Sequence, residues 1–151
     1  MPTAIVTLTI ASFTPTGSGN CVIGLPLITH AGGNRVELRK ATPTDHTIVV
    51  KQKGAAELAI QFAIVPAALY RAETITFVGE SGTIDPDGRE NFPPGRILKD
   101  QNAITVVNVF KHTGGSNNTP RPRWEYSIVV TEIASNRTGL IDPGIENSDQ
   151  N

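Results

Sequence analysis

The stretch ELAIQFAIV, from Glu57 to Val65, has the clearest periodic pattern in the chain. Its four large apolar side chains stand at positions 58, 60, 62 and 64, one at every second residue. Successive side chains of a β-strand point to opposite faces, so this period of two is typical of a strand with one buried face. The pattern therefore predicts a β-strand over 57–65.

The rest of the chain favours the same kind of element. Ile and Val together number 27 against 8 Leu, and β-branched side chains suit a pleated surface better than a helix. Gly and Pro punctuate the chain at short intervals, and no helical pattern of 10–15 residues separates the strand signals. We predict an all-β fold, a single antiparallel β-sandwich of about eight strands with Greek-key-like connections, although a barrel stays open. The other seven strands are expected at 4–11, 21–28, 36–40, 47–51, 74–78, 104–110 and 124–133.

The segment 21–28 is apolar on both faces but contains Gly24 and Pro26. Proline cannot donate to a β-ladder, so we expect an edge strand, a bulge or two short halves here. Cys21 is the single cysteine, and its apolar neighbours indicate a buried packing residue rather than a nucleophile. An unprotected edge is a template for association, so this segment is also a candidate for pairing with a second copy.

The 151 residues correspond to one domain, which we place at 1–145, followed by a flexible polar tail at 146–151. The formal net charge of −1 argues against a nucleic-acid-binding domain. A single cysteine excludes an internal disulfide framework. The first residues lack the basic region of a signal peptide, and no apolar run is long enough to span a membrane as a helix. We therefore expect a cytoplasmic protein that binds neither membranes nor nucleic acid.

The end of the chain carries a motif. A predicted strand, WEYSIVVT at Trp124–Thr131, is followed by a polar turn and then by IDPGIEN at Ile141–Asn147. This arrangement resembles the DP-EP family of small bacterial proteins and, more distantly, inclusion-body-type proteins whose last strand ends in Asp-Pro-aromatic-Ile. The resemblance implies a compact β-sandwich of bacterial origin. It implies no activity and no site residues, because the family has no established function.

A few polar residues could form a surface for a ligand or a partner. His112, Arg121, Arg123 and Trp124 combine basic and aromatic side chains around one polar segment. Asp85 and Asp142 each stand in an Ile-Asp-Pro tripeptide at a strand exit. The alternative for Asp85 is a turn with a local Asp cap, and the alternative for Trp124 is packing against the core.

Two other constellations are weaker. The three histidines, at 30, 46 and 112, lack the close spacing of a metal-ligand motif, so we predict no metal and no cofactor. Aromatic side chains can pack against sugar rings, which makes Trp124, Tyr126 and Tyr70 a possible sugar platform. With 8 aromatic residues in the chain, however, most must belong to the core.

We therefore predict a non-enzymatic structural or protein-interaction module that acts through an unknown protein partner or through self-association, for which a homodimer is the hypothesis. The alternative function is a domain that binds a small ligand, carbohydrate above all, through the loops at 79–100 and 112–122. An unrecognised hydrolase is the third hypothesis. A concave pocket among these loops would favour ligand binding, and a large flat apolar face would favour the interaction module.

Overall fold

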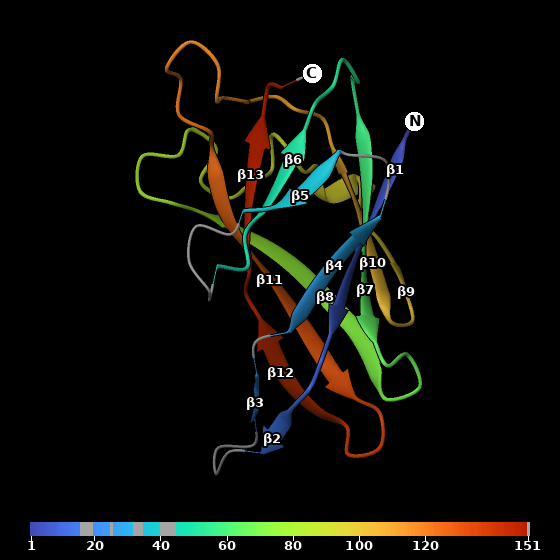
Figure 1. The fold of residues 1–151 in the computed structure, drawn as a ribbon. Coiled ribbons are helices and arrows are strands. Elements are labelled where there is room, and N and C mark those ends of the chain that lie inside the picture. Colours follow the sequence, from blue (N-terminus) through green and yellow to red (C-terminus); the bar gives the residue numbers. More distant parts are fainter. Residues whose placement is uncertain (16–19, 25, 32–34, 40–44, 151) are drawn as a thin grey trace.

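The computed structural model describes residues 1–15, 20–24, 26–31, 35–39 and 45–150, and these form two β-sheets packed face to face (Figure 1). The five-stranded sheet has the order β4 (Leu27–Ala31), β1 (Thr3–Thr9), β7 (Leu58–Val65), β10 (Ala103–Asn108) and β9 (Leu98–Asp100). The larger sheet has the order β2 (Phe13–Pro15), β3 (Asn20–Ile23), β12 (Arg137–Ile141), β11 (Arg123–Glu132), β13 (Gly144–Ser148), β6 (Ile48–Lys51) and β5 (Val36–Leu38), with β8 (Tyr70–Gly79) paired to β11. A single 3-10 turn, Pro94–Arg96, precedes β9.

The all-β, two-sheet class predicted from the sequence is confirmed, but the described residues contain more and shorter strands than the eight expected. The pairing is also mixed rather than purely antiparallel, because β1–β7, β3–β12 and β6–β13 are parallel pairs. The reason lies in the path of the chain, which crosses from one sheet to the other after β1, β3, β4, β6, β7, β8 and β10. A chain that returns to its first sheet in this way can lay a strand parallel to an earlier one.

The alternating pattern of β7 places its apolar residues in the core, as the sequence predicts. Leu58, Ile60, Phe62 and Ile64 are fully buried and face the larger sheet. They belong to the same core cluster as Trp124, Tyr126, Ile128 and Val130 of β11, and the rings of Phe62 and Tyr126 lie 4.6 Å apart. Full burial of each such side chain contributes about 1.5–3 kcal/mol.

The apolar segment 21–28 divides into two halves, one of the three outcomes expected from Pro26. Its first half is β3, which lies between β2 and β12 in the larger sheet. Its second half lies in β4, an edge strand of the five-stranded sheet. Cys21 is buried and unpaired, as the sequence predicts.

The end of the chain differs from the prediction. Residues 146–148, expected to begin a flexible tail, belong to β13, which is parallel to β6 and antiparallel to β11. Glu146, Asn147 and Ser148 are all buried. Polarity alone suggested a tail, but each of these residues finds hydrogen-bonding or ionic partners that are distant in sequence. Buried polar groups are tolerated when they are paired in this way.

Candidate functional site

Asp85 and Trp124, two residues predicted to lie on a binding surface, are instead buried together. The Trp124 indole Nε1 donates to the backbone oxygen of Asp85 at 2.5 Å. The Asp85 carboxylate accepts from the backbone nitrogens of Glu90 and Asn91 and from Asn91 Nδ2, at 2.9–3.1 Å. The alternative interpretations, an Asp cap for Asp85 and core packing for Trp124, are therefore the ones that hold. Together these bonds fix the loop 85–91 onto the sandwich.

Three buried asparagines extend this network below a second loop. Asn147 Nδ2 lies 3.2–3.3 Å from Asn91 Oδ1, Asn108 Oδ1 and the backbone oxygen of His112. Asn108 Nδ2 in turn donates to Asn147 Oδ1 at 2.8 Å, and the His112 backbone nitrogen donates to Asn91 Oδ1. The network joins two loops to β13 through groups shielded from water, where hydrogen bonds are strong.

The loop after β10 is held by hydrogen bonds at several points. Gly114 exchanges backbone hydrogen bonds with Asn147 and Asp149, and Ser116 Oγ donates to Asp149 Oδ1 at 2.7 Å. A Cβ at Gly114 would overlap the backbone carbonyl of Pro120, so the two arms of this loop touch here. These contacts hold the loop in a fixed position against β13.

The two anchored loops enclose a cleft of about 650 Å³, which we call the loop cleft. In Figure 1 the loops lie on the same side of the molecule, the first yellow-green and the second orange. The cleft is lined by residues 80–84 of the first loop and by residues 111–113 and 119–123 of the second. It thus lies between the two loops from which the sequence predicted ligand binding.

The charges of the loop cleft are unequal in number. Its described lining includes Lys111, Arg121 and Arg123 as cations, and only Glu80 as an anion. Arg123 Nε donates to Glu80 Oε1 at 2.6 Å, so Glu80 is already paired. Arg121 forms no hydrogen bond or ion pair with any residue that the structure describes, and its Nε is shielded from solvent. His112 Nε2 lies 3.4 Å from Glu90 Oε2.

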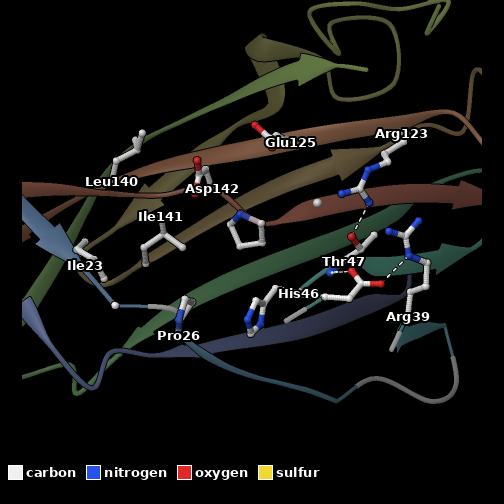
Figure 2. A pocket seen from close by; sticks show the side chains of 14 residues that line it. Ile23, Pro26, Arg39, His46, Thr47, Arg123, Glu125, Leu140, Ile141 and Asp142 are labelled. Atoms are coloured by element: carbon white, nitrogen blue, oxygen red, sulfur yellow. Dashed lines mark hydrogen bonds and ion pairs between the residues drawn. The ribbon is translucent and has the colours of Figure 1, made fainter. Parts of the chain in front are cut away.

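A second cavity, of about 320 Å³, lies on the other side of Arg123, and Figure 2 shows it from close by. Ile23, Leu140 and Ile141 form one end, and the two guanidinium groups of Arg39 and Arg123 lie at the other. The remaining labelled side chains, Pro26, His46, Thr47, Glu125 and Asp142, lie along its sides (Figure 2).

The arginines of the Figure 2 pocket are paired within the protein. Arg39 Nε donates to Asp45 Oδ2 and its Nη1 donates to Glu146 Oε2, both at 2.8 Å. These contacts, above all the hydrogen bond to Asp45, raise the pKa of Arg39. Arg123 Nη1 donates to Thr47 Oγ1 and lies 4.0 Å from Glu146 Oε2. This end of the pocket is an internal ion-pair network.

The six predicted surface residues are therefore distributed over three places. His112, Arg121 and Arg123 line the loop cleft, and Asp142 is exposed beside the Figure 2 pocket. Asp85 and Trp124 are buried. Sequence reasoning missed Glu146 and Asn147, because their partners are up to 107 residues away along the chain and no local pattern marks them.

The other constellations do not assemble. Trp124, Tyr126 and Tyr70 are buried, so they cannot offer their faces to a sugar. Burial raises the pKa of Tyr126, whose hydroxyl has no hydrogen-bond partner in the described protein. Among the described residues no three His, Cys, Asp or Glu side chains are grouped so that they could hold a metal ion.

Comparison with known proteins adds no family. No protein-family model matches the chain, and no curated protein matches it either. The resemblance to the DP-EP family accordingly stays a prediction. In the part of the chain that the structure describes, no helix is long and apolar enough to cross a membrane.

Proposed function

We propose that this protein is a non-enzymatic binding module and that the loop cleft is its binding site. The observation that carries the proposal is a cavity of about 650 Å³ between two loops that are each fixed to the sandwich by buried hydrogen bonds. Small-molecule sites are concave, largely preformed and of about 300–1,000 Å³. Preformed walls lower the entropy lost when a ligand is bound.

The side chains of the cleft also support binding. Thr113 and Thr119 offer hydroxyl groups, Thr83 Oγ1 already donates to the backbone oxygen of Arg123 at 3.1 Å, and Lys111 and Arg121 offer cationic donors. Such groups can hold and orient a polar ligand. The exposed aromatic face on which a neutral sugar would stack is not supplied by Trp124, which is fully buried in the core.

A thermal-unfolding screen tests the proposal, with panels of divalent metals, neutral sugars, nucleotides and small organic acids. A ligand at about 100 times its Kd adds about 2.7 kcal/mol to the stability of the folded state. For a chain of this size we expect a rise in Tm of roughly 5–10 °C.

A blocking variant locates the site. Thr119 is exposed and lines the cleft, so Thr119→Trp should fill part of it and abolish the rise in Tm. Ala134→Trp places the same bulk on an exposed turn outside the lining and should leave the rise unchanged. A ligand response that survives Thr119→Trp, or the absence of any response across the panels, would contradict the proposal.

A second function, self-association, is favoured by the outer face of the five-stranded sheet. β1, β4, β7 and β10 contain no Asp, Glu, Lys or Arg, and their outward rows pair Ile5 with Ala31 and Gln61, and Thr9 with Leu27 and Val65. These four strands carry no charged side chain that would repel a second copy, and the charged Lys99 and Asp100 lie on β9 at the edge of the sheet. Light scattering at micromolar concentration should then give a dimer that Ile5→Lys dissociates, and a monomeric wild-type protein would rule this function out.

A further inference from the structure

The loop cleft has an unused cation at a fixed position, and this indicates which ligand it takes. We propose that the cleft binds an oxyanion, a phosphate or carboxylate group carried by a small molecule, and that Arg121 is its principal contact. This inference rests on the proposed function, since it names the ligand class of the same site.

The Arg121 guanidinium has a defined position in the cleft. Its Nε is buried and has no acceptor among the described residues, its two terminal nitrogens donate to no residue that the structure describes, and the residue as a whole is half-buried. A Cβ at Gly115 would lie 3.1 Å from Arg121 Nε and 3.8 Å from Cζ, so the guanidinium lies closely against this glycine. The position of the group is therefore set by the loop, although no internal carboxylate holds it.

The contrast with the other partly buried arginines shows why this is unusual. Arg39 and Arg123 each contact two carboxylates, and Arg35 donates to the backbone oxygen of Gln52 at 3.0 Å. A guanidinium removed from part of its water without a partner costs free energy. A bound oxyanion would supply the missing acceptors, and it could do so with two parallel hydrogen bonds.

The rest of the lining adds positive charge. Lys111 is exposed, lines the same cleft and has no ion-pair partner in the described protein. Glu80, the acidic residue of the lining, is neutralised by Arg123 at 2.6 Å. Two cations thus remain uncompensated in one concave site, where their fields add.

The size of the cleft indicates that the anion is part of a larger molecule. A volume of about 650 Å³ exceeds the space that a single inorganic ion fills. The hydroxyls of Thr113 and Thr119 can contact the remaining polar part of such a ligand.

Amide NMR on the 15N-labelled full chain tests this inference at constant ionic strength. Inorganic phosphate, citrate and glucose are titrated separately, with sodium chloride as the blank, and the signals of 80–84 and 111–123 are followed. Phosphate or citrate should shift them saturably, and the stronger of the two identifies the oxyanion as phosphate or carboxylate. Glucose and chloride should have no saturable effect.

Charge variants complete the test. Arg121→Gln should weaken anion binding by about tenfold or more, the effect of losing a charge-assisted hydrogen bond, and Lys111→Gln by a smaller factor. Arg137→Gln removes an exposed arginine of β12, outside the cleft lining, and should leave the affinity unchanged.

The outcomes separate the two proposals. If glucose or another neutral compound shifts the cleft signals and the anions do not, the oxyanion inference is wrong while the binding site stands. Anion binding that is equal in wild type and Arg121→Gln would also overturn the inference. If no compound of the panels shifts the cleft signals, the proposed function itself fails.

Discussion

Arg123 lines both the loop cleft and the Figure 2 pocket, but the two cavities differ in whether their arginines are paired with carboxylates of the protein. In the Figure 2 pocket, Arg39 and Glu146 contact each other at 2.8 Å, so charge there holds the protein together. In the loop cleft, Arg121 has no internal partner among the described residues. Of two cavities that both contain arginine, the one with unpaired arginine is the better candidate for an external ligand, because its groups gain most from binding.

The largest expected effect tests whether the walls of the loop cleft are rigid. In Gly114→Ala, the new Cβ would overlap the Pro120 carbonyl, whose atoms belong to the backbone and cannot move away without opening the loop. We expect a loss of about 3 kcal/mol in the free energy of unfolding, measured by urea denaturation. Gly95→Ala is the control, since nothing lies within 4 Å of its Cβ position. Equal stability of the two variants would mean that the loop is pliable.

The next largest effect concerns the ion-pair network of the Figure 2 pocket. Glu146→Gln keeps the shape of a side chain whose exposure is 7% but removes the charge that faces Arg39 and Arg123. The variant leaves Arg39 paired with Asp45 and Arg123 paired with Glu80, but it removes the buried carboxylate that the two arginines share, so we expect a loss of about 2 kcal/mol in the same assay. An unchanged midpoint in the variant would show that the network adds no stability.

Removing the unpaired arginine of the loop cleft should not lower the stability of the unliganded protein. Arg121→Gln removes a guanidinium that has a buried, unpartnered Nε and no ion pair in the described protein. We expect unliganded stability to stay the same or to rise by up to about 1 kcal/mol. Tyr126→Phe, which removes the other buried unpartnered polar atom, should be similarly harmless and should leave cleft binding intact. A clear loss of stability in Arg121→Gln would show that this arginine is structural.

The smallest effect concerns an ion pair outside both cavities. Arg71 Nε donates to Glu73 Oε1 at 2.5 Å, and this hydrogen bond lowers the pKa of Glu73. A carboxylate whose pKa is lowered on folding stabilises the native state above its unfolded pKa and loses that contribution as the pH falls through its folded pKa. Glu73→Gln should cost a few tenths of a kcal/mol at pH 7 and nothing at about pH 2, because partly exposed pairs are weak. Urea denaturation at both pH values measures the difference, and an equal loss at both would exclude the ion pair as its cause.

Local pattern predicted much of the sandwich and only part of the site. The alternation in 57–65, Pro26 within 21–28 and the lone Cys21 all led to correct statements about strands and burial. The same reasoning placed Trp124 and Asp85 on a surface and left their burial as the alternative. It selected His112, Arg121 and Arg123, which the fold does bring to one cleft, because basic residues clustered along the chain stay neighbours in a loop.

What the sequence by itself determined is the class of the protein, since a period of two and an excess of β-branched residues depend only on neighbours along the chain. What only the tertiary structure decided is which of its polar residues are buried and paired. In the sequence, Glu146 and Asn147 look like part of a solvated tail. In the fold they bind Arg39, Asn108 and Asn91, which come from other parts of the chain. Arg121 and Arg123 are likewise equivalent in sequence, and they differ in space because Arg123 contacts a carboxylate and Arg121 has no such partner among the described residues. Pairing across the fold is a property of distance in space, which a local pattern does not contain.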